Sequence, residues 1–267
     1  MILLAALVSV GISACTRPQT TAIEVPADAD FLFQEKNIAR FGLRGSHKVA
    51  LTFDDGPSSR TTPRLLDLLK AEGVRATFFL VGGHARKNPS LLARLRAEGH
   101  VIGNHSDTHA NLTQGLYSEE PESVIREIQD THTVIAPYLV GQKHSYFRAP
   151  YGAWTRQHAT TLNEIAELST YIGPIYWTAG GRIKFNSEGA ILDAADWQCW
   201  SSKSQMSVEQ CADGYMAALE GHSGGVALLH DGPENTLALV SVLVQRLKVA
   251  GYEFVTLDDL ETLDQYQ

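Results

Sequence analysis

The chain has 267 residues, of which 44% are hydrophobic and 19% are charged, and its formal net charge is −8 at pH 7. This size and balance fit a globular protein with one large α/β domain or two small ones around a substantial core. The acidic balance and the lack of a Lys/Arg cluster argue against nucleic acid as a partner, because phosphate binding requires clustered positive charge.

The beginning of the chain predicts export. Residues 1–14 are apolar and end in small side chains, which makes them too short for a permanent membrane-spanning helix but suitable as a signal-peptide core. Ile12-Ser13-Ala14-Cys15 resembles a bacterial lipoprotein processing site, although the usual Lys or Arg near the start is missing. We therefore expect lipidation of Cys15 and anchoring to a membrane of the cell envelope. The alternatives are an ordinary signal peptide, with a periplasmic or secreted product, or a buried N-terminal segment.

The next stretch is typical of a tether. From Thr16 to about Phe33, Thr, Pro and Ala occur without an apolar period. We assign residues 16–45 to this tether and residues 46–262 to the folded domain.

From Lys48 onward, short apolar runs typical of strands alternate with helical patterns. In chain order, the expected elements are strand 48–53, helix 60–72, strand 76–81, helix 88–98, strand 100–103, helix 119–138, strand 146–148, helix 157–168, strand 171–177 (interrupted by Gly173-Pro174), helix 207–220, strand 225–230, helix 236–249 and strand 253–257.

This repeated alternation predicts an α/β fold with a parallel sheet and helical crossovers, and the short apolar strands indicate a sheet that is covered on both faces. An open doubly wound sheet and a closed barrel both fit the pattern. We see neither a repeat of fixed period nor an internal linker, so a single domain is favoured over a solenoid.

Polar residues follow several of the predicted strands, where parallel α/β folds form their sites. Asp54 and Asp55 come first and precede the turn residues Gly56-Pro57. Consecutive side chains leaving a strand point in different directions, so one carboxylate can bind a metal while the other faces a water beside it. A surface turn is the alternative interpretation, because Asp-Gly-Pro is common turn chemistry.

The second motif is a pair of histidines, His105 and His109. At this spacing they share one face if the segment is helical, and neutral imidazole is a ligand that suits zinc and its neighbours. Taken alone, such a pair is more often two surface or hydrogen-bonded histidines than a metal site.

Three further motifs lie later in the chain. Arg148 at a strand end could orient a carboxylate by a bidentate contact, and the following Pro-Tyr-Gly turn could present backbone N–H groups to a site. The other two motifs are Asp193-Ala194-Ala195-Asp196-Trp197 and Leu228-Leu229-His230-Asp231. Each also has a structural interpretation: an ion pair with a tight turn, a capped loop with a core tryptophan, and a core histidine.

The two remaining cysteines, Cys199 and Cys211, lie twelve positions apart. In an exported protein they predict a disulfide, which would fasten the loop that holds Trp197 and Trp200 to the following helix. Two buried free thiols are the alternative. A zinc site built on these two cysteines is disfavoured, because there is no second cysteine pair.

Taken in order, the five motifs resemble the polysaccharide deacetylase family, also called the NodB homology domain or carbohydrate esterase family 4. The resemblance extends from about His47 to Leu260. It implies a single-domain, distorted (β/α)7-type barrel. It also implies a metal-dependent hydrolase that removes acetyl groups from an N- or O-acetylated polysaccharide or oligosaccharide such as peptidoglycan or chitin. An acetylxylan-type esterase and a catalytically silent carbohydrate-binding module of the same fold are the alternatives, and we expect a monomer.

The resemblance also implies a role for each motif residue. It implies one divalent metal, usually zinc, with cobalt or nickel as alternatives, and catalysis by a general base and a general acid. The implied metal ligands are Asp55, His105 and His109; the base is Asp54, oriented by Arg148; the acid is His230; Asp196, or alternatively Asp193, supports Arg148 or tunes His230; and the substrate side is formed by Pro150, Tyr151 with its backbone N–H, Trp197 and Leu228.

The stretch from Glu164 to Trp200 is long between the third and fourth motifs, so we expect an elaborated loop there. Its aromatic residues Tyr176, Trp177 and Trp200 could stack on sugar rings or pack a core, and the sequence favours neither.

Overall fold

The computed structural model describes residues 43–120 and 122–261. The predictions for Cys15, for the signal peptide and for most of the tether lie outside the described residues. Within the described part, no helix combines the length and the apolar character that a membrane crossing requires.

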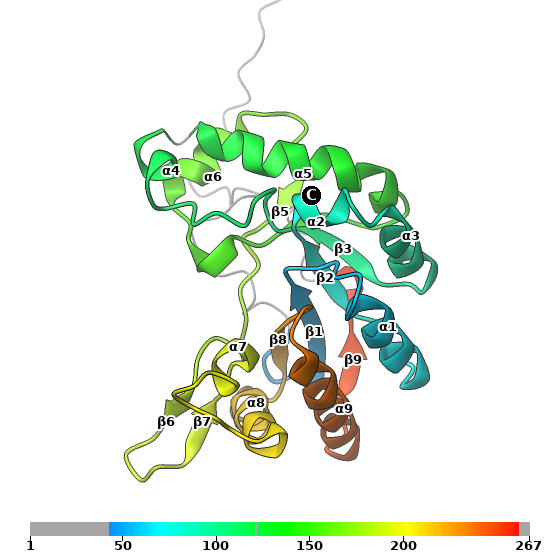
Figure 1. Cartoon of the computed structure of the whole chain (residues 1–267), viewed down its shortest axis with the longest axis vertical. Coiled ribbons are helices and arrows are strands. Elements are labelled where there is room, and N and C mark those ends of the chain that lie inside the picture. Colours follow the sequence, from blue (N-terminus) through cyan, green and yellow to red (C-terminus); the bar gives the residue numbers. More distant parts are fainter. Residues whose placement is uncertain (1–42, 121, 262–267) are drawn as a thin grey trace, which may run out of the picture.

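A parallel sheet forms the centre of the molecule (Figure 1). Its strand order is β5-β4-β3-β2-β1-β8, and β9 pairs with β1. The strands are β1 (Lys48–Asp54), β2 (Thr77–Leu80), β3 (Val101–Asn104), β4 (Ser145–Phe147), β5 (Tyr171–Ile172), β8 (Gly225–His230) and β9 (Glu253–Val255). Every pairing in this sheet is parallel, so all strand ends that carry the motifs lie at one edge.

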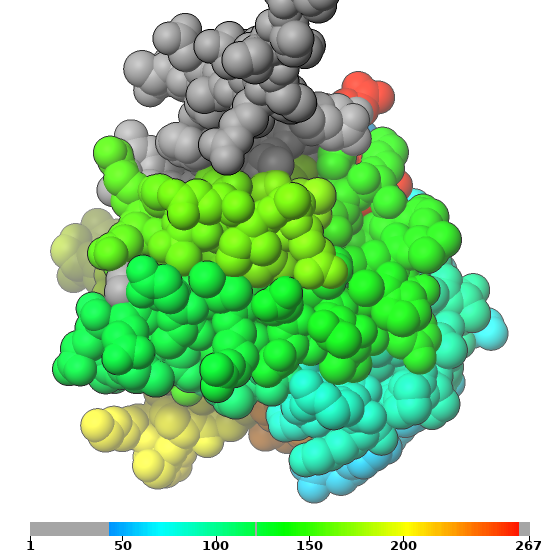
Figure 2. Space-filling view, turned by 90° about the horizontal axis from the view of Figure 1, so that it is seen from above, coloured from blue at the N-terminus to red at the C-terminus, as the bar shows by residue number. Residues whose placement is uncertain are grey.

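Helices connect and cover these strands, as Figure 1 shows for α1, α3, α8 and α9. The helices are α1 (Thr62–Ala71), α2 (Gly82–Ala85), α3 (Pro89–Ala97), α4 (Leu116–Glu119), α5 (Ser123–Leu139), α6 (Arg156–Asn163), α7 (Asp196–Cys199), α8 (Val208–His222) and α9 (Glu234–Val249). Short 3-10 turns occur at Pro150–Gly152 and Leu257–Asp259. Seen from above, the green surface around α4 and α5 extends across most of the width of the molecule (Figure 2).

Successive residues of the strands pack into different cores. On β1, Leu51 and Phe53 belong to the cluster that packs against α1, α3, α8 and α9, whereas Ala50 belongs to a second cluster. On β2, Phe78 and Phe79 divide in the same way. Because side chains alternate along a strand, a sheet that is apolar on both faces must be covered on both.

The sheet curves into a distorted (β/α)7-type barrel, which confirms the predicted fold class. An isolated parallel bridge between Ala179 and Ala227 places the segment after β5 beside β8. This bridge brings the two ends of the strand order together, and it decides between the open sheet and the barrel that the sequence left as alternatives.

The elements differ from the predicted ones mainly in this region. The predicted strand 171–177 is paired only over Tyr171–Ile172, since Pro174 has no N–H to donate and Gly173 lies so close to β4 that a Cβ would approach the Phe147 carbonyl oxygen to 2.6 Å. The expected elaborated loop contains an antiparallel hairpin, β6 (Lys184–Phe185) and β7 (Ile191–Asp193), which projects away from the sheet in Figure 1. The predicted helix 119–138 corresponds to α5, which begins later, at Ser123, whereas Glu119 is the last residue of the separate short helix α4.

Candidate active site

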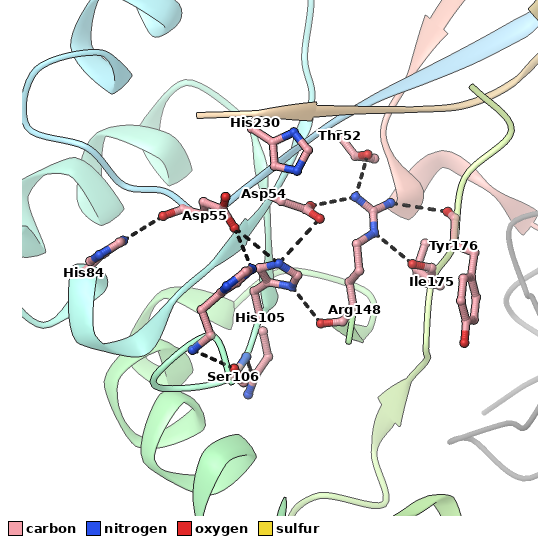
Figure 3. Close-up of polar contacts among 12 residues, drawn as sticks. Thr52, Asp54, Asp55, His84, His105, Ser106, Arg148, Ile175, Tyr176 and His230 are labelled. Carbon is pink, nitrogen blue, oxygen red and sulfur yellow. Dashed lines mark hydrogen bonds and ion pairs between the residues drawn. The ribbon is translucent and has the colours of Figure 1, made fainter. Parts of the chain in front are cut away.

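The polar residues of the motifs meet at the carboxyl edge of the sheet. Asp54 is the last residue of β1, His230 is the last residue of β8, and Arg148 directly follows β4. Figure 3 shows these three side chains around Asp55 and His105. The motifs, which follow one another along the chain, thus place their side chains around one point of the structure.

Asp55, His105 and His109 form a group that could hold a metal ion, with one ligand atom from each residue within 4.8 Å of the others. Oδ1 of Asp55 lies 3.1 Å from Nε2 of His109 and 3.5 Å from Nε2 of His105. Burial alone would raise the pKa of Asp55, but the two imidazoles outweigh it and hold this pKa well below its usual range. The carboxylate is therefore ionised, as a metal ligand must be.

Two observations fit this group to a divalent metal. Oδ1 of Asp55 is buried and accepts no hydrogen bond from the described residues, so a positive partner is missing. Nδ1 of His105 lies 2.8 Å from the carbonyl oxygen of Arg148. Because a carbonyl only accepts, Nδ1 carries a proton, and Nε2 of the neutral ring is then the atom that can bind a metal. One carboxylate with two imidazoles is a donor set that zinc and its neighbours accept.

The histidine pair is not on a helix, contrary to the geometry that the spacing suggested. Residues 105–109 form a loop after β3, in which Ser106 and His109 have φ angles of 61° and 59°. Such left-handed conformations cost about 1–3 kcal/mol each for residues other than glycine, so the surroundings must stabilise them. This loop, rather than a helix turn, brings both imidazoles to Asp55.

Arg148 is buried, with 1% of its surface exposed, and its guanidinium is bonded on every side. Nη1 donates to Oδ1 of Asp54 at 2.7 Å and to Oγ1 of Thr52 at 2.8 Å. Nε and Nη2 donate to the carbonyl oxygens of Ile175 and Tyr176. The contact with Asp54 uses one nitrogen, so the bidentate geometry that we expected is wrong. Burial lowers the pKa of Arg148, and the adjacent Asp54 acts against that shift.

His230 is paired with the buried Asp196. Nδ1 of His230 lies 2.7 Å from Oδ1 of Asp196, and the backbone N–H of His230 donates to Oδ2 at 2.7 Å. Burial alone would lower the pKa of His230, but Asp196, with Asp54 and Asp55, raises it to about 9. Of the two roles considered for Asp196, the geometry places it on His230. Asp193 lies elsewhere and accepts from the N–H of Gly180.

Asp54, His230 and the three candidate metal ligands line a cavity of about 430 Å³. Its walls include Tyr151, which is 68% exposed and whose ring meets that of His109 edge-on at 4.8 Å. The complete lining is Asp54, Asp55, His105, His109, Ala149, Tyr151, Trp177, Gly181, Trp197, Leu228, His230, Asp231, Gly232 and Pro233. Pro150 is buried in its turn and does not line the cavity.

The sequence left open whether Tyr176, Trp177 and Trp200 stack on sugar rings or pack a core, and the structure places them differently. Trp177 lines the cavity beside Gly181, where a Cβ would come within 2.4 Å of the indole nitrogen. Trp200 packs against the core cluster of α8 and α9, and Tyr176 packs against the cluster inside the barrel. Of Tyr176, Trp177 and Trp200, Trp177 is therefore the one that a substrate can reach, although it also packs against the cluster inside the barrel.

Several residues of the site were not assigned a role from the sequence. Asp231 lies in the cavity wall, its N–H donates to the carbonyl oxygen of Asp54, and its carboxylate accepts from Thr61 and Thr62. Burial raises the pKa of Asp231 to about 6. His84 lies with Nδ1 2.8 Å from the carbonyl oxygen of Asp55. The position of Asp231 directly after His230 could have indicated that it belongs to the site, whereas nothing in the sequence around His84 indicated its place there.

The predicted disulfide is present. Cys199, at the end of α7, is bonded to Cys211 of α8, and their Cα atoms are 6.0 Å apart. Asp196 and Trp197 lie on the same short helix α7. The disulfide therefore fastens to α8 the helix that presents both residues to the site.

Comparisons with known proteins agree with this geometry. A family model described as polysaccharide deacetylase matches residues 43–168. The chitooligosaccharide deacetylase of Rhizobium leguminosarum bv. trifolii is 33% identical over 184 residues, which are 69% of this chain and 71% of that protein. The peptidoglycan-N-acetylglucosamine deacetylase PgdA of Listeria monocytogenes is 32% identical over 213 residues, 80% of this chain, and the chain spans 38% of its length.

A solved structure is also similar. The Bc1960 peptidoglycan N-acetylglucosamine deacetylase, determined in complex with an N-hydroxybenzamide compound, superposes with a TM-score of 0.61 and 27% identity. The match covers 80% of this chain and 87% of that one. The shared fold thus extends over most of the described residues.

Proposed function

Because this chain belongs to the polysaccharide deacetylase family, we propose that it is a metal-dependent hydrolase that removes acetyl groups from an N-acetylated polysaccharide or oligosaccharide. The observation that carries the proposal is the cavity that joins three groups: the candidate metal ligands, the Asp54–Arg148 pair and the His230–Asp196 pair. A water and an acetyl group fit between a base and an acid in this arrangement.

Asp55, His105 and His109 would hold the metal, with zinc as the first candidate and cobalt or nickel as alternatives. When bound, a divalent metal polarises the acetyl carbonyl and makes an attacking water easier to deprotonate. Asp54 takes the proton from this water. Its carboxylate is oriented for that role by the guanidinium of Arg148, which is itself fixed by Thr52 and by the carbonyl oxygens of Ile175 and Tyr176.

His230 donates the proton that the departing sugar nitrogen or oxygen requires. With its pKa raised to about 9, it is protonated at neutral pH, and Asp196 fixes the orientation of its ring. We assign the N–H of Tyr151 to the developing oxyanion, and Trp197 and Leu228 to the wall around the acetyl methyl group.

Peptidoglycan and chitin oligomers are the first candidates for the substrate, because the relatives named above act on glycans of these kinds. An acetylxylan-type ester is the second candidate, since amides and esters pass through similar tetrahedral intermediates. A silent carbohydrate-binding module is disfavoured because the proposed base Asp54, the proposed acid His230 and the three candidate metal ligands all line one cavity.

Export, lipidation of Cys15 and a monomeric state remain part of the proposal. The support for export and lipidation is the apolar stretch before Cys15, and the disulfide between Cys199 and Cys211 is the pairing expected outside a reducing compartment.

The test measures metal binding and acetate release separately. Chitooligosaccharides, peptidoglycan and acetylxylan are each incubated with the protein, with chelator, and with chelator followed by metal. Asp55→Ala should lose metal binding and acetate release together. Asp54→Asn should keep the metal but release acetate about 10²–10⁴-fold more slowly, because it removes only the base.

Each outcome separates the alternatives. No release from any of the three substrates would favour the binding module. Release that persists after verified metal removal would contradict metal dependence, and full activity of Asp54→Asn would contradict the assignment of the base.

A further inference from the structure

The loop 105–109 is held by a carboxylate that lies outside the motifs. The backbone N–H groups of Asp107 and Thr108, the two residues before His109, both donate to Oε2 of Glu127, at 3.0 and 2.9 Å. The other N–H groups of the loop are bonded to neighbouring acceptors at the end of β2, at the end of β3 and within the loop. Glu127 therefore accepts hydrogen bonds from the two N–H groups of the loop that these neighbouring acceptors do not bind.

The second oxygen of Glu127 is also fully used. Oε1 accepts from Oγ1 of Thr108 and from the hydroxyl of Tyr117, each at 2.7 Å. Glu127 is 6% exposed, and burial would raise its pKa, but the hydrogen bonds from Thr108, Tyr117 and Asp107 outweigh burial and lower it. An ionised carboxylate only accepts hydrogen bonds, so it matches four donors with no unsatisfied proton.

The opposite side of the loop is fixed by backbone groups. The carbonyl oxygens of Ser106 and Asp107 accept from the N–H groups of Gly82 and Gly83 at the start of α2, both at 3.0 Å. A Cβ on Gly82 would come within 2.3 Å of the Asp107 carboxylate, so the loop and α2 are in tight contact. The loop is thus clamped between α2 and the Glu127 side chain of α5.

We propose that Glu127 is a positioning residue of the metal site. Its carboxylate fixes Asp107 and Thr108, and the loop then holds His109 in its left-handed conformation with Nε2 facing Asp55. Glu127 is not itself a ligand, because both of its oxygens are already occupied by donors of the loop and of Tyr117. This inference rests on the proposed function only for the presence of a metal at Asp55, His105 and His109.

The test is the affinity of the purified protein for Zn²⁺, measured against a chromophoric chelator, together with the absorption spectrum of the Co²⁺-loaded protein. Glu127→Gln keeps the size of the side chain but turns an NH₂ group toward N–H or O–H donors. We expect the Zn²⁺ affinity to fall about 10–100-fold, as is typical when a partner behind a ligand is lost. The Co²⁺ spectrum should also change, because the position of His109 changes.

Two further variants complete the design. Asp130→Asn is the matched control: it lies on the exposed side of the same helix and removes the same charge, so affinity and spectrum should stay as in the parent protein. Tyr117→Phe removes one donor to Glu127 and leaves the carboxylate in place, so it should weaken Zn²⁺ binding by less than Glu127→Gln does.

A folded Glu127→Gln protein with the parent affinity and spectrum would overturn the inference and leave Glu127 as a structural anchor of α5. If Glu127→Gln does not fold, Tyr117→Phe decides, and an unchanged affinity in that variant has the same meaning. Acetate release is not part of the readout. A parent protein that binds Zn²⁺ but releases no acetate contradicts the proposed function alone, and one that binds no metal contradicts both.

Discussion

The proposed base and the proposed acid each depend on a buried carboxylate: Asp54 is the base itself, and Asp196 contacts the acid His230. Asp54 is 3% exposed and contacts the guanidinium of Arg148 at 2.7 Å. Asp196 is fully buried and contacts the imidazole of His230, whose protonated form it favours. A cation beside the proposed base and an anion beside the proposed acid are environments typical of acid–base pairs. The assignment of base and acid therefore follows from the contacts of each residue.

The pH dependence of the acid can be tested through Asp196. A histidine with a raised pKa is protonated below that pKa and loses its proton as the pH rises through it. Asp196→Asn removes the negative charge, so the pKa of His230 should fall by about 1–3 units. The alkaline limb of the acetate-release profile should then move to lower pH by a similar amount. The ring titration, followed by NMR in the metal-free protein, reports the same shift directly.

Asp193→Asn is the control for this shift, because Asp193 is also buried but bonds to Gly180 and not to His230. Its alkaline limb should stay where the parent protein has it. An unchanged His230 titration in Asp196→Asn would show that Asp196 orients the ring without setting its protonation.

Most of the site could be predicted because its residues lie at or directly after the ends of apolar strands, and parallel strands end at one edge. Asp54, Arg148 and His230 are of this kind. Glu127 and His84 could not be found in this way. Glu127 lies on a helix and reaches a loop 19 and 20 positions earlier in the chain, and the ring of His84 meets a backbone oxygen of Asp55. Contacts of this type depend on how helices, loops and strands pack together, and the spacing of residues along the sequence does not predict that packing.

At the scale of elements, α7 is the segment that most depends on its surroundings. It has four residues, too few for a helix that is stable alone. Asp196 at its start is held by the hydroxyl of Tyr215, to which its N–H donates, and Cys199 at its end is held by the disulfide to α8. The geometry of the acid thus depends on two contacts with α8.

Loss of the disulfide should therefore affect both stability and activity. Joining residues 12 positions apart stabilises a fold by about 2–3 kcal/mol through the restriction of the unfolded chain. We expect the double variant Cys199→Ser/Cys211→Ser to lose about this much free energy of unfolding in urea, and to release acetate more slowly because α7 is held only at its start. The parent protein in reductant should behave like the double variant. Coincident unfolding curves with and without reductant would contradict this role.

The elements of the long stretch 164–200 were the least predictable. The apolar run 171–177 suggested one strand, yet only its first two residues pair with β4. The hairpin of β6 and β7 has exposed residues at Lys184 and Phe185 and no apolar alternation that would mark it in the sequence. Short strands that bury little surface leave little pattern, so their positions follow from the fold rather than from local preference.

At the scale of the whole molecule, alternating strands and helices predicted the parallel sheet but not its closure. Closure depends on the contact between Ala179 and Ala227, which are 48 positions apart and of which the first lies outside any extended strand. The same closure places Trp177 in the cavity wall. The long-range backbone hydrogen bonds of Thr178 and Ala179 with the strand β8 therefore determine both the barrel and one wall of the site, and only the family resemblance pointed to the barrel beforehand.

The stability of the whole fold should depend on pH through His100. This residue is 1% exposed, its Nδ1 accepts from the N–H of Ala76, and its ring meets Phe78 edge-on. Burial lowers its pKa to about 4, against about 6.5 in an unfolded chain. Between these values only the unfolded chain binds the proton, so this residue's contribution to stability is present above pH 6.5 and is lost as the pH falls toward 4.

His100→Asn isolates this effect, because its side-chain oxygen can replace Nδ1 as the acceptor without titrating. Other groups, such as Asp231 with a pKa raised to about 6, titrate in the same range in both proteins, so the comparison is between the two pH profiles. Urea unfolding with chelator present should show that the parent protein loses about 2 kcal/mol more than the variant between pH 7 and pH 5. Parallel profiles would mean that His100 is protonated in the folded protein, with its positive charge accommodated beside Phe78.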